Sequence, residues 1–261
     1  MNFKETAYII MGGTTGMGLS AAIALASQGA KVLVVGRNAE SCAKAKQQLG
    51  KGNLAISGDA TDPDCIENAI KLAHTNFGTI TGLFHVAGGS GRKFGDGPLD
   101  KITLEGWNKT MELNLTSLML SNRAMVNYFL SHKKPGVILN MGSVLGFAPS
   151  PKHFATHAYA AAKSAIIGFS KSIASYYAIE NIRVNVIAPS LFATPMAKRA
   201  VEDGEIRKFL KTKQPLDGGR PGVSEDINNA VLMFLSPSSK FITGQVLAVD
   251  GGWALSEGQY Q

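Results

Sequence analysis

Short apolar segments that can form strands alternate with longer segments that can form helices along the whole chain. The strands are expected at residues 7–11, 31–35, 54–57, 82–87, 136–141, 183–188 and 245–249, and the helices at 18–28, 39–49, 65–77, 103–130, 155–177 and 224–235. Thr103 and Ser224 are the expected caps of the helices that they begin. Strands that alternate with helices build a mostly parallel sheet covered on both faces. We therefore expect an α/β fold with a doubly wound, parallel, seven-stranded sheet.

The length and composition are compatible with one domain over residues 1–261, because 45% of the residues are hydrophobic and no Pro/Ser-rich linker or internal repeat divides the chain. No apolar stretch approaches the ~20 residues of a membrane helix. The polar start and the short apolar run after it do not match a secretory signal. We expect a cytoplasmic protein without a membrane partner.

The net charge of +7 comes from scattered lysines and arginines. The densest basic stretch, residues 198–213, is interrupted by acidic residues, so a nucleic-acid partner is not expected, whereas a positive field favours phosphorylated cofactors. No cluster of His, Cys and Asp predicts a metal site, and Cys42 and Cys65 are expected to be ordinary thiols.

A glycine-rich turn, GGTTGMG, follows the first expected strand at residues 12–18. A dinucleotide-binding turn must bend sharply, bring its backbone close to a pyrophosphate and start a helix whose dipole favours the anion. Glycine is also common in ordinary turns, but the position at the first strand-to-helix junction favours a cofactor site. The expected contacts from this turn are Gly12, Thr14, Thr15, Gly16, Met17 and Gly18.

The second expected strand ends in Gly36, Arg37 and Asn38, without the carboxylate that NAD-binding turns usually place near the ribose 2′-hydroxyl. The guanidinium of Arg37 suits a 2′-phosphate, so NADP(H) is favoured over NAD(H); the alternative is a solvated turn arginine. Asp59, followed by Ala60, can accept a hydrogen bond from the adenine amino group or cap its own turn.

Tyr159 and Lys163 are four residues apart, so they share one face of the expected helix. A lysine cation favours the phenolate, and we expect it to lower the tyrosine pKa from its usual ~10 toward values useful for proton transfer. An ordinary amphipathic helix with the same two residues is the alternative. The sequence around them decides between these interpretations.

Ser143 follows the fifth expected strand, where its hydroxyl could hold a substrate oxygen beside Tyr159; the alternative is a simple turn serine. Asn114 interrupts an apolar helical stretch, and burying its amide without partners would cost a few kcal/mol. A hydrogen bond that serves the site would explain it, as would a satisfied core asparagine.

In this order, these residues resemble the short-chain dehydrogenase/reductase family, in its single-domain branch similar to 3-oxoacyl-ACP reductases, over nearly the whole chain. The resemblance implies a Rossmann fold in which Asn114, Ser143, Tyr159 and Lys163 form the catalytic tetrad. Tyr159 would protonate the substrate, Ser143 would orient it, Lys163 would also bind the nicotinamide ribose, and Asn114 would hold a water. The further cofactor contacts that it implies are Ala87, Gly88, Gly89, Pro189, Ser190, Phe192 and Thr194.

The chain departs from the family pattern at the fourth strand, which ends His85-Val86-Ala87-Gly88 where Asn-Asn-Ala-Gly is usual. The first of those asparagines usually ties neighbouring strands together, so His85 must do so or leave the link unmade.

The substrate pocket is expected to be apolar, as ligand pockets usually are. Its expected lining, besides Ser143 and Tyr159, is Ser90, Gly91, Val144, Leu145, Phe154, Leu191 and Phe192. Residues 193–222 are expected to form a lid. Basic residues are expected around the entrance: Arg92, Lys93, Lys152, Lys198 and Arg199. They could recognise an acyl carrier or coenzyme A thioester, or simply be solvated surface charge.

Together these features predict an NADP(H)-dependent short-chain oxidoreductase that moves hydride between nicotinamide and a small carbonyl/alcohol substrate. The alternative is a non-catalytic dinucleotide-binding sensor or scaffold, because a fold does not dictate function. The resemblance implies a homotetramer, and the apolar end Trp253-Ala254-Leu255 is expected to need a partner surface.

Overall fold

The computed structural model describes residues 2–150 and 153–257 and is built on a parallel sheet of seven strands in the order β3-β2-β1-β4-β5-β6-β7. The strands are β1 (Ala7–Met11), β2 (Lys31–Gly36), β3 (Leu54–Ser57), β4 (Gly82–His85), β5 (Gly136–Met141), β6 (Ile182–Pro189) and β7 (Val246–Val249). All six neighbouring pairs are parallel, which confirms the predicted doubly wound sheet.

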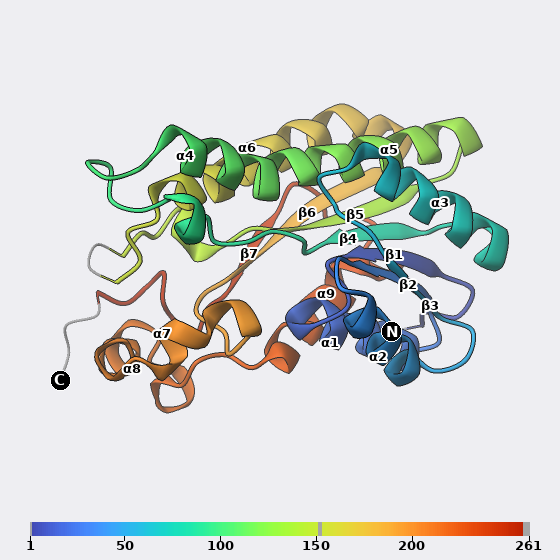
Figure 1. Cartoon of the computed structure of the whole chain (residues 1–261). Coiled ribbons are helices and arrows are strands. Elements are labelled where there is room, and N and C mark those ends of the chain that lie inside the picture. Colours follow the sequence, from blue (N-terminus) through green and yellow to red (C-terminus); the bar gives the residue numbers. More distant parts are fainter. Residues whose placement is uncertain (1, 151–152, 258–261) are drawn as a thin grey trace.

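Helices cover both faces of the sheet (Figure 1). One face carries α1 (Gly16–Ser27), α2 (Ala39–Leu49) and α9 (Asn228–Leu235), and the other carries α3 (Pro63–Phe77), α4 (Leu104–Met111), α5 (Ser117–His132) and α6 (His157–Tyr177). Successive strand side chains point to opposite faces, so Ile10 packs in the core under α1 and α9 while Ile9 packs in the core under α3 and α5.

The strand order reverses between β1 and β4, which are neighbours in space but distant in sequence. The chain leaves β1 toward α1 on one face and leaves β4 toward α4 on the other. A crevice therefore opens at the carboxyl ends of these strands, which is where open α/β sheets bind ligands. No described helix has the length and apolar character needed to cross a membrane.

The helix predicted over residues 103–130 is interrupted. Thr103 caps α4 as expected, accepting a hydrogen bond from the Gly106 amide at 2.9 Å. A π-helical turn, Glu112–Thr116, then separates α4 from α5. The side-chain amide of Asn114 donates to the Thr110 carbonyl one turn earlier, at 2.9 Å, and so competes with the backbone for that acceptor. Such π turns often mark functional sites.

The prediction that Ser224 caps the last helix is wrong. Residues Ser224–Ile227 form a 3₁₀ turn, and α9 begins only at Asn228. The capping contact comes instead from Asp226, whose carboxylate accepts from the Val223 amide at 2.8 Å. Asp226 also pairs with Arg220 at 2.7 Å, so this carboxylate is held in place from both sides.

Candidate active site

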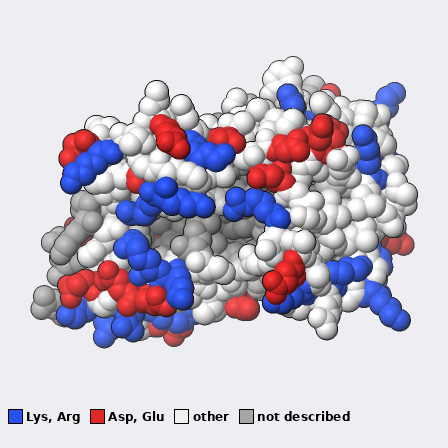
Figure 2. All heavy atoms as spheres, viewed as in Figure 1, with Lys and Arg blue, Asp and Glu red and all other residues white. Residues whose placement is uncertain are grey.

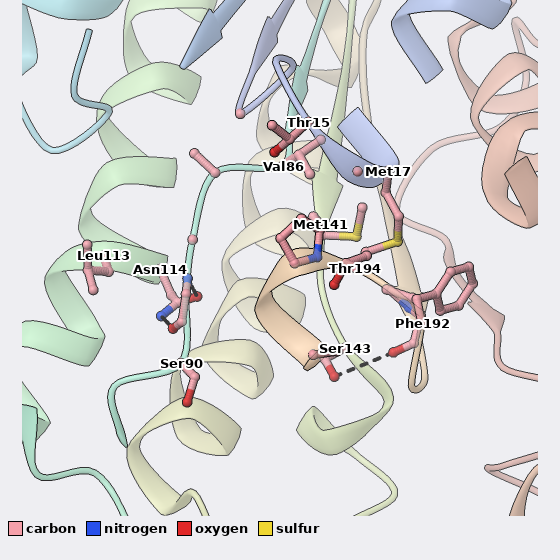
Figure 3. Close-up of a pocket in the computed structure, with 18 of the residues that line it drawn as sticks. Thr15, Met17, Val86, Ser90, Leu113, Asn114, Met141, Ser143, Phe192 and Thr194 are labelled. Carbon is pink, nitrogen blue, oxygen red and sulfur yellow. Dashed lines mark hydrogen bonds between the residues drawn. The ribbon is translucent and has the colours of Figure 1, made fainter. Parts of the chain in front are cut away.

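A cavity of about 840 Å³ opens along the carboxyl ends of the strands. It runs from the turn after β2, past the glycine turn after β1, to the segments that follow β5 and β6. Figure 2 shows it as a hollow on this face of the molecule, and Figure 3 shows side chains from opposite sides of the sheet pointing into it.

The glycine turn has the geometry that a close backbone approach requires. Gly12 has a φ of +80°, and a Cβ there would lie 2.7 Å from the amide nitrogen of Ala87, in the segment that follows β4. A Cβ on Gly18 would lie 2.2 Å from the Gly12 carbonyl oxygen. Gly18 therefore lets α1 pack against the turn and does not line the cavity, which corrects its assignment as a cofactor contact.

The amino end of α1 opens into the cavity beside this turn. Thr15 occupies the N-cap position, but its side chain makes no capping hydrogen bond, and the first turn of α1 carries no acidic residue. The first amides of a helix have no partner within it, and its dipole favours negative charge there. The turn thus fits a pyrophosphate group.

Of the side chains that follow β2 and β3, some form hydrogen bonds within the protein and others are free to contact a ligand. Asn38 caps α2 by accepting from the Ser41 amide at 2.8 Å. The Asp59 carboxylate accepts from the Thr61 amide at 2.9 Å, and this bond is the main reason that its pKa lies below the ordinary value. Arg37 is exposed at the cavity edge and forms no ion pair with a described residue, so its guanidinium is available to a ligand.

Backbone contacts hold Ser143 and Lys163 near Tyr159. Ser143 lies two residues after the end of β5. Its hydroxyl accepts from the Leu145 amide at 3.2 Å and donates weakly to the Pro189 carbonyl at 3.5 Å (Figure 3). Lys163 is buried, and its Nζ donates to the Met141 carbonyl at 2.9 Å. That Nζ lies 5.5 Å from the ring centroid of Tyr159.

Burial controls the proton affinities at this site. The Tyr159 side chain is largely buried and lines the cavity, and the surrounding protein raises its pKa to about 12, against a smaller lowering effect of Ser143. Burial also lowers the pKa of Lys163 to about 8. The expected lowering of the tyrosine pKa by Lys163 is not found in this arrangement: burial raises the pKa, and the smaller opposing effect comes from the hydrogen bond with Ser143.

Asn114 joins the β4–α4 loop to the site. Its amide donates to the Gly89 carbonyl at 2.9 Å, and its carbonyl accepts from the Gly89 amide at 3.2 Å. A Cβ on Gly88 would lie 2.6 Å from the Asn114 oxygen and 3.7 Å from Lys163 Nζ. The fully buried asparagine is thus satisfied by backbone and holds this loop directly over the lysine.

Asp96 positions the catalytic helix, although the sequence analysis did not single it out. It is 5% exposed, and its two carboxylate oxygens accept from the amides of Ala158 and Tyr159 at 3.0 and 3.1 Å. The first amides of α6 have no acceptor within the helix, so the carboxylate supplies one. Its negative charge also interacts favourably with the helix dipole. The contact joins positions 62 and 63 residues apart, so no local spacing could have revealed it.

His85 does not tie β4 to a neighbouring strand. It is 1% exposed; its Nε2 donates to the Ala87 carbonyl at 3.1 Å, and its Nδ1 faces the Ser121 hydroxyl at 2.7 Å. The ring thus links β4 to α5. Burial, followed by the Lys163 cation, lowers its pKa to about 3, so it is neutral at physiological pH.

The apolar wall of the cavity contains the predicted Val144, Leu145, Phe154 and Leu191, but Gly91 is turned away against Thr110. Trp253 also lines it, which the sequence analysis missed. The indole is 1% exposed and donates to the Ala148 carbonyl at 3.0 Å. The expectation that this apolar end needs a partner is thus wrong for Trp253, which is buried within its own chain.

Of the basic residues predicted around the entrance, Arg92 and Arg199 contribute to the lining of the cavity, whereas Lys93 and Lys198 do not. Lys152 lies outside the described residues. The structure brings all the other predicted site residues to this cavity. Those predicted for catalysis and cofactor binding that line it are Gly12, Thr14, Thr15, Gly16, Met17, Gly36, Arg37, Asn38, Asp59, Ala60, Ala87, Gly88, Gly89, Asn114, Ser143, Tyr159, Lys163, Pro189, Ser190, Phe192 and Thr194.

Comparison with known proteins agrees with this geometry. A family model described as enoyl-(acyl carrier protein) reductase matches residues 12–254. The 3-oxoacyl-[acyl-carrier-protein] reductase FabG of Escherichia coli is 33% identical over 252 residues, which cover 97% of this chain and 98% of that protein. The chain belongs to the short-chain dehydrogenase/reductase family.

Two further proteins are similar to this one over most of the chain. The inactive 2-(S)-hydroxypropyl-CoM dehydrogenase 2 of Xanthobacter autotrophicus is 34% identical over 228 residues, which cover 86% of this chain and 95% of that protein. A solved short-chain type dehydrogenase/reductase from Mycobacterium ulcerans is 29% identical with a TM-score of 0.89, and the match covers 98% of this chain and 92% of that one. The chain is thus a nicotinamide-dependent dehydrogenase/reductase that acts on hydroxyl or carbonyl groups.

Proposed function

We propose that the protein is an NADP(H)-dependent carbonyl reductase/alcohol dehydrogenase with Asn114, Ser143, Tyr159 and Lys163 as its catalytic residues. The observation that carries the proposal is their convergence on one cavity that continues to the glycine turn. A bound nicotinamide dinucleotide would supply or accept the hydride. The turn of Gly12 and Gly16 would hold its pyrophosphate, because no Cβ obstructs the approach there.

Each of the four proposed catalytic residues has a separate role in the reaction. Tyr159 donates its phenolic proton to the developing alkoxide in reduction and accepts it in the reverse direction. Ser143 binds the same oxygen and orients it, since its hydroxyl already lies between the Leu145 amide and the Pro189 carbonyl. Lys163 holds a positive charge beside the phenol and is available to the nicotinamide ribose. Asn114 keeps the loop over Lys163 in place and would hold a water that leads to solvent.

A ketone screen tests the activity. Loss of NADPH absorbance is followed with a panel of neutral and charged ketones, and turnover of at least one is expected. The family member named inactive, and the principle that fold does not dictate function, make a non-catalytic sensor the competing outcome. Tight cofactor binding without reduction of any carbonyl would favour the sensor.

The preference for NADP(H) rests on Arg37, the exposed guanidinium at the cavity end beyond β2. A guanidinium matches a 2′-phosphate in charge and geometry, and the turn offers no carboxylate to the 2′-hydroxyl of NAD. Titration by nicotinamide fluorescence should give tighter binding of NADPH than of NADH, and Arg37→Gln should remove the difference. Equal affinities in the wild type would contradict this role.

The proposal also covers the oligomeric state and a segment that closes over the substrate. We place the subunit in a homotetramer because large apolar side chains are exposed, among them Tyr176 at 75% and Ile179 at 85%. The segment 193–222 would close over the substrate; it contains α7 (Lys198–Glu202) and α8 (Gly204–Lys213) and packs on Val144 and Trp253 through Ala200 and Leu210. Light scattering tests the tetramer, and hydrogen exchange with and without cofactor tests the lid.

A further inference from the structure

Two arginines from different segments contribute to the lining of the cavity at its substrate end. Arg92 belongs to the 3₁₀ turn Arg92–Phe94 after β4, and Arg199 belongs to α7 in the predicted lid. Both line the cavity and lie within electrostatic range of each other. Figure 2 shows Lys and Arg side chains bordering the hollow on this face.

Neither arginine is neutralised by a carboxylate. Among residues 2–150 and 153–257, no ion pair involves Arg92 or Arg199. The contact of Arg92 is a long bond, 3.4 Å, to the His153 carbonyl. By contrast, Arg220 is paired with two carboxylates, at 2.6 and 2.7 Å. The cavity arginines therefore carry charge without an acceptor that matches their geometry.

Asp96, which acts electrostatically on Arg92, and Asp203, which feels the charge of Arg199, are both committed to helix ends. Asp96 accepts two amides at the start of α6, and Asp203 accepts two amides at the start of α8, at 2.9 and 3.1 Å. They lessen the positive field around Arg92 and Arg199 but do not bond to them. Surrounding protein, followed by the charge of Arg199, lowers the pKa of Arg92, and the opposing effect of the Asp96 charge is smaller than either.

These arginines are positioned for the substrate and not for the cofactor phosphates. Arg92 follows the loop that Asn114 holds over Lys163, and it bonds to the loop that carries His153 and Phe154. Arg199 adjoins Ala200, which packs with the pocket-wall residues Val144 and Leu191. The glycine turn and Arg37 lie at the part of the cavity that follows β1 and β2.

We propose that the substrate of this enzyme carries a compact oxyanion, a carboxylate, sulfonate or phosphate, which Arg92 and Arg199 bind together. This deepens and rests on the proposed carbonyl/alcohol activity, because the anion would lie at the other end of the molecule from the oxygen held by Ser143 and Tyr159. Guanidinium groups form paired hydrogen bonds to such anions, and one negative charge between two cations removes their repulsion. The anion would also join the lid to the β4–α4 loop.

Matched pairs of ketones that differ only in charge test the subsite. Acetoacetate and levulinate are compared with their methyl esters, and acetonylphosphonate is compared with its dimethyl ester. For at least one pair, wild type is expected to show a kcat/KM about tenfold or more higher for the anion. Arg92→Gln and Arg199→Gln should each lower this value about 10- to 100-fold, mainly through KM, and change kcat/KM for the ester less than about threefold.

Arg207→Gln is the matched control, because Arg207 is exposed on neighbouring α8 and does not line the cavity. It should keep the wild-type preference. NADPH affinity should be unchanged in Arg92→Gln and Arg199→Gln; a weakened affinity would assign the arginines to the cofactor and overturn the proposal. Equal use of anion and ester by wild type in every pair, or equal losses on both in the arginine variants, would also overturn it.

Binding without turnover separates this proposal from the one on which it rests. Saturation-transfer NMR measures levulinate and methyl levulinate on the NADP⁺ complex. If no ketone is reduced but levulinate binds better than its ester, and Arg92→Gln or Arg199→Gln removes that advantage, the oxyanion site stands and the reductase activity fails. If neutral ketones are reduced and levulinate has no advantage in binding or turnover, the activity stands and the oxyanion site is refuted.

Discussion

Buried His85 should make the stability of the protein depend on pH in a way that one substitution removes. Its pKa lies near 3 in the folded chain, against an ordinary value of 6.5. Because the folded pKa is lowered, the neutral ring contributes stability that is fully present above pH 6.5. That contribution is lost as the pH falls from 6.5 toward 3, since only the unfolded chain takes up the proton.

The size of this effect follows from the two pKa values. Each pH unit below the ordinary pKa costs about 1.4 kcal/mol until the folded pKa is reached. At pH 5, about 1.5 units below that value, the wild type should have lost about 2 kcal/mol through His85, whereas at pH 7 the loss is negligible. For a chain of this size, that corresponds to a decrease in Tm of about 4–8 °C.

His85→Asn supplies the comparison, because an asparagine does not titrate in this range. Tm is measured for both proteins from pH 7.5 to pH 5, so that histidines common to both cancel. The wild type is expected to lose several degrees relative to His85→Asn, with the difference growing below pH 6.5 whatever the offset at pH 7.5. Parallel curves for the two proteins would refute the assignment of His85 as a buried ring that stays neutral.

Three further outcomes follow from the site. Asp96→Asn should lower the free energy of unfolding by about 1–3 kcal/mol and lower kcat with little change in NADPH affinity, because one charged acceptor is lost at α6. The exposed Asp100→Asn is the control, and equal behaviour of the two variants would contradict the capping role of Asp96. Gly18→Ala should weaken NADPH binding at least about tenfold, measured by fluorescence, because its Cβ would meet a backbone oxygen at 2.2 Å; wild-type affinity would show that the turn adjusts. The kcat/KM for ketone reduction should fall above pH 8, where Lys163, with its pKa lowered to about 8, loses its proton; a profile that stays flat to pH 10 would disprove this.

Much of the fold could be predicted because βαβ alternation is a local signal. Short apolar runs bounded by glycines located the strands to within a residue or two, and the order of motifs placed the glycine turn and Tyr159 in one crevice. The interruption at Asn114 could not be predicted, because the π turn depends on an amide bonding to the Thr110 and Gly89 carbonyls. The spacing of apolar residues does not report such contacts.

The electrostatics of the site were harder to predict from the sequence than the fold. Helical spacing correctly brought Lys163 near Tyr159, but the effect of that cation depends on how far both groups are removed from water, which spacing does not encode. The role of Asp96 likewise arises only when a loop after β4 meets the first turn of α6. Trp253 looked like a surface residue because its partners, Phe154 and Phe209, are distant in sequence.

The central claim is that the Tyr159 hydroxyl transfers the proton while the cofactor is bound beside it. The most direct measurement compares Tyr159→Phe with Tyr176→Phe, a control on the exposed side of the same helix. Single-turnover reduction of an accepted ketone should be at least about 100-fold slower in Tyr159→Phe and unchanged in Tyr176→Phe, with NADPH affinity preserved in both. Wild-type rates in Tyr159→Phe would contradict the account.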